Sequence, residues 1–139
     1  MIKVDDVFVF EIDENNWWAE LFGISDDDCD PLLEIPPQIT LNDETVVDVI
    51  AVRGYHIGLS SKKVENIVVS SIVQYIYDYS ITYFPNLKTI TIRNPDCYIS
   101  KNCGIHNCSD KDITIIGFEN SSAETYAKEH NIKFKILEL

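Results

Sequence analysis

The sequence predicts an α+β, mostly β fold in which short strands stack as a solenoid, and three observations predict it. The apolar triplets at 67–69, 90–92 and 113–115 recur at intervals of 23 residues. The pairs Tyr75-Ile76 and Tyr98-Ile99 keep the same interval. Each unit also carries an apolar-x-x-apolar-x-apolar pattern, as in Val64-x-x-Ile67-x-Val69. A period of roughly 20 to 29 residues with this pattern is typical of leucine-rich repeats, so we expect about three repeats of 23 residues.

Each repeat is expected to supply a short strand whose apolar side is buried only when neighbouring repeats stack on it. Because side chains alternate along a strand, Ile67, Ile90 and Ile92 should face the core, together with Leu87. The residues between them should form the outward face of a parallel sheet three strands wide. That face comprises Asn66, Val68 and Ser70, then Thr89, Thr91 and Arg93, then Asp112, Thr114 and Ile116. It is either a solvated sheet surface or a surface that binds a partner.

The 139 residues are expected to form a single domain with three parts. Residues 1–30 are predicted to be an acidic β-hairpin cap and residues 31–116 the leucine-rich repeats. Residues 117–139 are predicted to be a C-terminal cap of one helix and one strand. Such caps are expected because the terminal repeats of a solenoid would otherwise expose apolar surface.

The hairpin is predicted from apolar alternation over residues 4–12, a turn at Asp13–Asn16 and a returning strand at Trp17–Ile24. One of Trp17 and Trp18 must then face outward, either as an interface anchor or half-buried against the first repeat. Residues 39–52 are expected to be a degenerate first repeat. Its core would contain Val46, Val47, Val49 and Ile50.

The C-terminal helix is predicted from Ser121 and Glu124, whose spacing fits a capping box. Its buried face would carry Ala123, Tyr126 and Ala127. Asn131 suits the left-handed residue that ends a helix. The alternation of Ile132, Phe134 and Ile136 then predicts the last strand.

The stretch from Val64 to Pro95 resembles the BspA-like, or Treponema pallidum-type, leucine-rich repeats. The resemblance is carried by VENIVVSSIVQYIYDYSITYFPNLKTITI over residues 64–92. The family usually shows an Ile-rich strand, Pro-Ser-x-Val, Ile-Gly-x-x-Ala-Phe and then Cys-x-x-Leu-x-x-Ile. Ser70, Tyr77 and Phe84 stand at the usual Pro, Gly and Cys, and Ser80-Ile81 replaces Ala-Phe.

The resemblance extends over roughly residues 31–139. Asn94–Cys97 and Ile115–Phe134 look like the terminal unit of that family. The resemblance implies the family's fold, a bacterial setting, and functions in adhesion or partner binding. Because one fold serves many functions, it does not identify the partner.

Tyrosines form a second candidate binding surface. Tyr75, Tyr77 and Tyr79 alternate with Ile76 and Asp78, so their three rings should share the outer side if Ile76 faces the core. Tyr98 should stack beside Tyr75 from the next repeat. Tyr rings offer a large contact area at a small entropic cost, although the same rings could simply pack on one another.

The charge is concentrated in the N-terminal third. Residues 1–48 hold 14 acidic residues and one basic residue, giving −13, and residues 49–139 hold nine and ten, giving +1. This acidity could keep an exposed end soluble, or it could bind a basic partner through Asp26, Asp27 and Asp28. Direct nucleic-acid binding is disfavoured, because phosphate contacts need clustered Lys and Arg.

The four cysteines, at 29, 97, 103 and 108, are expected to be free thiols, with no metal and no cofactor bound. The spacing around Cys103, His106 and Cys108 lacks the Cys-x-x-Cys pair of a zinc site. The Asp-rich loop 25–31 does not match a twelve-residue calcium loop.

An enzyme is not expected. His56, His106 and His130 are isolated in the sequence, and it contains no nucleophile motif and no phosphate-binding glycine loop. We therefore predict a non-catalytic protein-protein interaction module that binds through its solenoid surface.

Two alternatives remain: an acidic, phage-type inhibitor that occupies the nucleic-acid groove of a basic enzyme, or a secreted adhesin fragment. No segment reads as a membrane span or a signal peptide, so the cytoplasm is expected. A secreted or cell-surface location is expected instead if a longer precursor has been cut.

Overall fold

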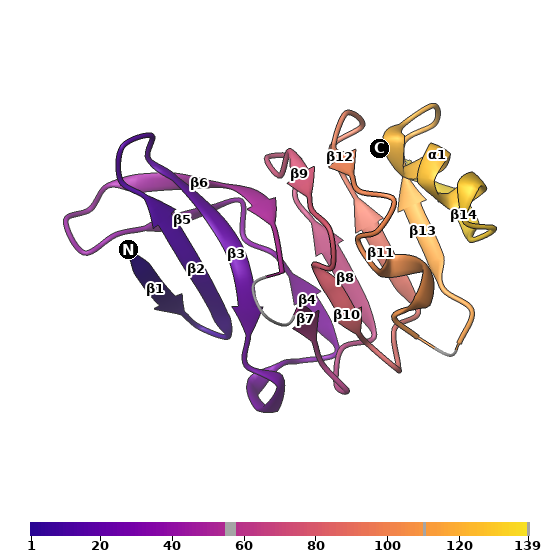
Figure 1. Cartoon of the computed structure of the whole chain (residues 1–139), viewed down its shortest axis with the longest axis horizontal. Coiled ribbons are helices and arrows are strands. Elements are labelled where there is room, and N and C mark those ends of the chain that lie inside the picture. Colours follow the sequence, from indigo (N-terminus) through magenta and orange to yellow (C-terminus); the bar gives the residue numbers. More distant parts are fainter. Residues whose placement is uncertain (55–57, 110, 139) are drawn as a thin grey trace.

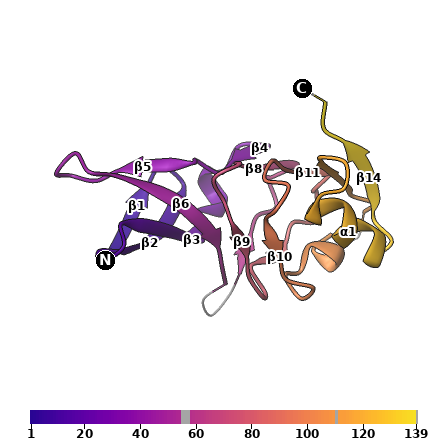
Figure 2. The same ribbon diagram turned by 90° about the horizontal axis from the view of Figure 1, so that it is seen from above.

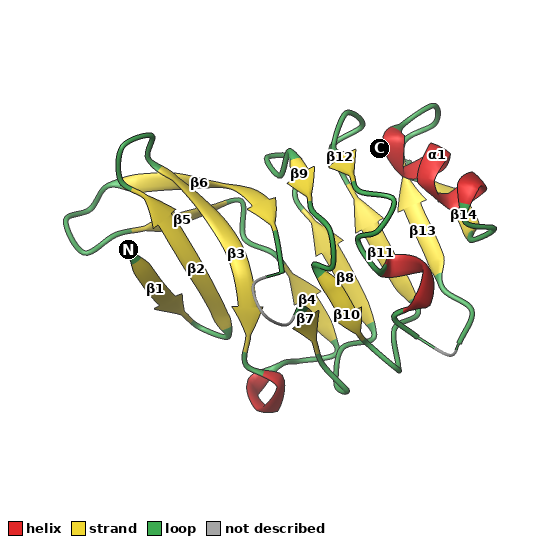
Figure 3. Ribbon diagram, viewed as in Figure 1, coloured by secondary structure: helices red, strands yellow, loops and turns green. Residues whose placement is uncertain are grey.

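The apolar periodicity of the sequence appears in the molecule as a stack of short strands along its long axis (Figure 1). A computed structural model describes residues 1–54, 58–109 and 111–138 of the chain. The N-terminal strands lie at one end of the stack, and the helix and the last strand lie at the other. Strands and short turns make up most of the described chain (Figure 3).

One side of the stack is a parallel sheet, which we name sheet B, to which the described residues contribute five strands. In spatial order they are β14 (Lys133–Ile136), β13 (Thr114–Gly117), β11 (Thr89–Ile92), β8 (Asn66–Val69) and β4 (Leu32–Glu34). All neighbouring pairs in this order are parallel. The sheet is wider than the three strands expected, because β4 and β14 add a strand at each edge.

The other side contains sheet A, to which the described residues contribute seven strands. They are β1 (Ile2–Asp5), β2 (Phe8–Asp13), β3 (Trp18–Ile24), β5 (Gln38–Thr40), β6 (Val46–Val52), β9 (Tyr75–Ile76) and β12 (Tyr98–Ile99). Strands β3, β6, β9 and β12 are parallel neighbours, whereas β1, β2 and β3 form an antiparallel meander. A short sheet C pairs β7 (Leu59–Ser60) with β10 (Ile81–Tyr83). From above, β8 and β9 lie on opposite sides of the stack (Figure 2).

The repeat interval changes along sheet B. Ile90 pairs with Ile67, an interval of 23 residues, but its partner on β13 is Ile115, an interval of 25. The expected alignment of Ile113 with Ile90 is therefore wrong by two residues. The connection from β12 to β13 contains a 3-10 turn, η2 (Ile105–Asn107). Because side chains alternate with period two, the shift leaves Ile113 and Ile115 on the buried side.

The core follows the predicted alternation. Ile67, Leu87, Ile90 and Ile92 are each at most 1% exposed. On the outward face one expectation fails: Thr91 is buried, because its register partners Val68 and Ile116 lie on both sides of it.

The N-terminal hairpin is present as β2 and β3, with β1 added along its edge. Phe8, Phe10 and Ile12 face the same core as the repeats. Trp17 and Trp18 are both exposed, so the expectation that one would be half-buried is wrong. Trp17 lies in the turn with a φ of 58°, and only Trp18 belongs to β3.

Residues 39–52, which were expected to be a degenerate first repeat, contain β6, a parallel neighbour of the repeat strand β9. β5 adds an antiparallel partner to β6, which the repeat pattern did not predict. Val47 and Val49 are buried as predicted, whereas Val46 is 54% exposed and Ile50 is half-buried. Ala51 and Val52 are both fully buried, so the alternation of β6 ends after its bulge against β3.

The C-terminal helix α1 (Ser122–Glu129) begins as predicted. Ser121 Oγ accepts a hydrogen bond from Glu124 N–H at 3.3 Å, and Ala123, Tyr126 and Ala127 are buried. Asn131 has a φ of 56°. In β14 the alternation holds only in part, because Ile136 is 46% exposed at the edge of sheet B.

Candidate functional site

The outer side of sheet A carries a cluster of aromatic side chains, of which three are exposed and Tyr75 is half-buried. The Tyr75 and Tyr77 rings are stacked, with centroids 5.3 Å apart and an interplanar angle of 4°. Tyr98 is the register partner of Tyr75 on the neighbouring strand, as predicted, and it is 56% exposed. Trp18 lies on β3, two strands away on the other side. We name Trp18, Tyr75, Tyr77 and Tyr98 the aromatic face.

Two shallow hollows flank the stacked pair, and Tyr75 and Tyr77 line both of them. The first has a volume of about 360 Å³ and is lined by Asp13, Trp18, Glu20, Ile50, Gln74, Tyr75 and Tyr77. The second has a volume of about 470 Å³ and is lined by Tyr75, Tyr77, Asp78 and Tyr98. The stacked pair is therefore a ridge between two open depressions.

Carboxylates border both hollows. Burial, and then the negative charge of Glu20, raise the pKa of Tyr77 above its usual value. Arg53 lies 3.3 Å from both Glu20 and Glu11, measured between guanidinium nitrogen and carboxylate oxygen. Asp78 accepts a hydrogen bond from Ser100 Oγ. The aromatic face therefore has an acidic border.

Tyr79 does not join this face, although the sequence placed it there. It has a φ of 56° and is 71% exposed. Because the left-handed backbone interrupts the extended alternation after Tyr77, Tyr79 lines neither hollow.

The outer face of sheet B has fewer groups available to a partner. Thr89 Oγ1 donates a hydrogen bond of 2.6 Å to Asn66 Oδ1 on the neighbouring strand. Thr91 is buried, and Val68 and Thr114 are half-buried. Arg93 is exposed beyond the end of β11. The hydrogen bond between Thr89 and Asn66 therefore already uses two of the polar groups of this face.

The acidic loop is anchored to the first full repeat. Its 3-10 turn η1 (Asp26–Asp28) places Asp26 Oδ1 3.0 Å from Lys62 N–H, which donates to it. The hydrogen bonds that Asp26 accepts from the Ser61 side chain and from Lys62 N–H keep the pKa of Asp26 below its usual value. Asp28 accepts from Ser25 Oγ at 2.8 Å, and Asp27 is exposed. Asp26 therefore has a structural role that the sequence did not indicate.

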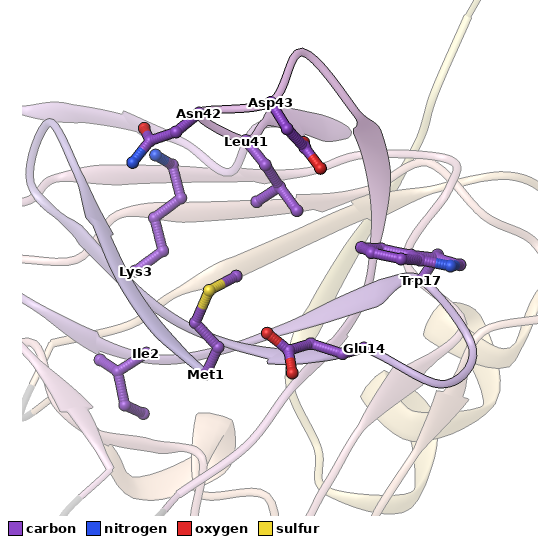
Figure 4. A pocket seen from close by; sticks show the side chains of 8 residues that line it. All are labelled: Met1, Ile2, Lys3, Glu14, Trp17, Leu41, Asn42 and Asp43. Carbon is purple, nitrogen blue, oxygen red and sulfur yellow. The ribbon is translucent and has the colours of Figure 1, made fainter.

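A further hollow of about 270 Å³ lies at the N-terminal end of the molecule (Figure 4). The figure shows Met1, Leu41 and Trp17 around this hollow. Lys3 on β1 and Glu14 in the turn between β2 and β3 also line it. Asn42 and Asp43 also line this hollow.

Two histidines that look isolated in the sequence lie together beside α1. The His106 and His130 ring centroids are 4.5 Å apart, and the His130 ring stacks on Tyr126 at 4.1 Å. The Tyr126 hydroxyl lies 2.9 Å from His106 Nδ1 and 3.4 Å from Cys103 Sγ. His56 lies outside the described residues.

This cluster packs the loop before β13 against α1 and does not have the chemistry of a nucleophile. A reactive cysteine needs a lowered pKa, and burial raises the pKa of Cys103 above its usual value. Within the described ranges, no group of three His, Cys, Asp or Glu side chains is placed to hold a metal ion.

The histidine pair should make stability depend on pH. Burial, and then the charge of His130, lower the pKa of His106 below 6.5, so the unfolded chain binds the proton more readily. The stability that neutral His106 contributes is fully present above the pKa that His106 has in the unfolded chain. It is lost as the pH falls through the lower pKa of His106 in the folded protein. Urea midpoints at pH 7.5 and pH 5.0 should differ more for the wild type than for His106→Gln. An equal difference for both proteins would contradict this assignment.

The four cysteines are buried free thiols. Burial raises the pKa of Cys97 and of Cys108 to about 12, and it raises the pKa of Cys29 as well. Since the thiolate is the reactive form, a disulfide reagent should react slowly with the folded protein. After unfolding without a reductant it should titrate four thiols. A titre of two would indicate a disulfide.

No helix in the described part of the chain is long and apolar enough to cross a membrane. No protein-family model matches the sequence, and no curated protein matches it either.

Solved structures of similar fold are leucine-rich-repeat proteins. A leucine-rich repeat protein from Bacteroides ovatus aligns with a TM-score of 0.54 and 17% identity, over 97% of this chain and 41% of that chain. A leucine rich cell surface protein from Faecalibacterium prausnitzii aligns with a TM-score of 0.49 and 14% identity, over 99% of this chain and 30% of that chain. The chain therefore spans less than half the length of either protein. The likeness to the Bacteroides ovatus protein shows that this chain has a leucine-rich-repeat fold.

Proposed function

We propose that this chain is a non-catalytic protein-protein interaction module of the BspA-like type, and that it binds its partner through the aromatic face. The observation that carries the proposal is the stacked Tyr75–Tyr77 pair, which stands between two open hollows and is extended by Tyr98 and Trp18. Tyr and Trp are enriched among the residues that dominate binding energy at protein interfaces. Exposed aromatic clusters of this kind mark binding surfaces more often than single exposed apolar residues do.

The packing of Tyr75 on Tyr77 also favours this surface over a merely solvated sheet. Rings that are held by stacking lose little conformational freedom when a partner binds. The sheet B residues Asn66 and Thr89 already satisfy each other, and Thr91 is buried. The sequence-based candidates on sheet B, which also include Val68, Arg93 and Thr114, form the second choice of binding face.

The −13 charge of residues 1–48 supports one alternative, an acidic inhibitor that binds a basic enzyme. Asp27 and Asp28 would belong to its contact surface, and long-range attraction would speed association. Asp26 is less suited to this role, because its carboxylate already accepts the Lys62 N–H.

A photo-crosslinking amino acid at position 77 tests the proposal, with the same group at Thr89 and at Asp27 as matched positions. We expect a discrete crosslinked protein from position 77 in extracts of the native organism. That partner is then purified and its affinity measured. Tyr77→Ala should weaken binding by about 30-fold or more, as truncation of a dominant interface residue does, and Thr91→Val should have little effect.

If the partner binds the acidic loop or sheet B instead, the same affinity measurements should give different results. Binding that survives Tyr77→Ala but is lost with Asp27→Lys and Asp28→Lys would favour the acidic inhibitor. Loss with Thr91→Val at unchanged stability would favour sheet B. Asp26 is left unchanged so that the charge reversal does not disturb the loop.

A further inference from the structure

We propose that the aromatic face recognises an extended segment of its partner that places two cationic side chains, arginines above all, in the two hollows. This inference rests on the proposed function and adds the chemistry of the partner. It follows from the groups that line the hollows and from an arrangement on the same sheet that already holds a guanidinium.

Each hollow combines aromatic faces with a carboxylate. Trp18 and the stacked tyrosines line the first together with Asp13 and Glu20. Tyr98 and the same tyrosines line the second together with Asp78. The described residues that line either hollow include no Lys and no Arg. An aromatic face attracts a cation through its quadrupole, and a carboxylate binds a guanidinium through charge-assisted hydrogen bonds.

Arg53 shows that this surface accommodates such a group. Its guanidinium lies 5.2 Å from the centroid of the Phe22 ring. The same guanidinium lies 3.3 Å from Glu11 and 3.3 Å from Glu20. One aromatic ring and two carboxylates therefore hold a guanidinium beside the first hollow. Of the two carboxylates that line the first hollow, Glu20 already pairs with Arg53, which leaves Asp13 for a partner's cation, and the second hollow offers Asp78.

The electrostatics of the whole chain favour a basic partner over a neutral one. Residues 1–48 carry −13 and supply Asp13, Trp18 and Glu20 to the first hollow. The surrounding field would steer a basic segment toward this side of the molecule and speed its association at low ionic strength.

The separation of the hollows limits the spacing of the two cations. The first hollow extends from β3 to β9, and the second from β9 to β12. Neighbouring strands lie about 4.8 Å apart, so the hollow centres are roughly one to two strand spacings from each other. An extended chain advances about 3.3 Å per residue. Since side chains at positions i and i+2 of an extended chain point to the same side, we expect Arg-x-Arg to fit, and longer spacings to bind less well.

Fluorescein-labelled nine-residue peptides of Gly and Ser with two arginines test the inference, with citrulline replacing arginine as the neutral control. The arginine peptides should bind at least about fivefold more tightly than the citrulline peptides, because citrulline lacks the cation–π and ionic attraction. Fluorescence anisotropy measures both. Affinity should fall as salt rises, because exposed charges are screened.

Asp78→Asn removes one charge from the second hollow and retains an acceptor for Ser100 Oγ. It should weaken the arginine peptides severalfold. Asp112→Asn is the matched control, since Asp112 is exposed on the other side of the stack. Equal weakening by both variants would show nonspecific attraction and overturn the inference.

The inference and the proposed function fail in different ways. If the partner crosslinks to position 77 and depends on Tyr77, but arginine and citrulline peptides bind equally, the function stands and the cationic segment is rejected. If Tyr77→Ala leaves both the partner and the peptides bound as before, the aromatic face is not the binding surface. Chitotriose that shifts the Tyr resonances in NMR spectra, where the arginine peptides do not, would identify a saccharide site instead.

Discussion

Ile90→Ala is expected to lower the free energy of unfolding by about 2–5 kcal/mol, the usual cost of truncating a buried isoleucine. Ile90 is fully buried on β11, and its register partners are Ile67 on one side and Ile115 on the other. Because each repeat buries its apolar face only against its neighbours, a cavity here loosens two interfaces at once. Urea unfolding followed by far-UV circular dichroism measures the change.

Ile136→Ala is the matched control for this experiment. The same atoms are removed, but Ile136 is 46% exposed on the edge strand β14. The loss should stay below about 1 kcal/mol, since most of the lost side chain was in contact with water. A loss below that level for Ile90→Ala itself would show that the register of sheet B is wrong.

The alternation of buried and outward residues could be read from the sequence because it depends on one local rule. Val64, Ile67 and Val69 repeat as Leu87, Ile90 and Ile92, and all six are buried. The capping residues of α1 are also local signals, since Ser121 and Glu124 need only the first helical turn to interact.

The register of β13 could not be read in the same way. A shift of two residues keeps every side chain on its own side of the strand, so the apolar pattern fits both alignments equally well. The interval of 25 residues between Ile90 and Ile115 depends on the path of the loop around η2. That path depends on contacts with α1, including the Tyr126 hydroxyl bonded to His106 N–H.

The candidate site was predictable only within one repeat and its neighbour. Tyr75 and Tyr98 share the repeat interval, so their pairing followed from the sequence. The first hollow required Trp18 to lie near Tyr75, and this depends on β3 pairing in parallel with β6. Such pairing between a hairpin strand and a repeat strand has no local signature. For the same reason, the contact of Arg53 with Glu11 and Glu20 was not predicted.

The second large effect is expected at Gly104, whose backbone lies close to that of Ile81 in the preceding repeat. Gly104 has a φ of 104°, and a Cβ added there would lie 1.9 Å from the carbonyl oxygen of Ile81. The approach is close because Ile81 N–H donates to the Cys103 carbonyl oxygen at 2.9 Å. In Gly104→Ala, the alanine must therefore adopt a backbone conformation that is unfavourable for a residue with a side chain. Its Cβ must also push the backbone segments around Gly104 and Ile81 apart.

We expect Gly104→Ala to lower the free energy of unfolding by at least about 2 kcal/mol, from backbone strain together with the clash. Gly23→Ala is the control, because its added Cβ would meet only the Val9 side chain, at 3.3 Å. Thermal unfolding of both variants separates the two cases. If Gly104→Ala unfolds with the wild type, the contact between Cys103 and Ile81 is not what sets the spacing of these repeats. If only Gly104→Ala is destabilised, the close backbone approach at Gly104 is what the stacking of the last repeat requires, and this explains why glycine stands at that position.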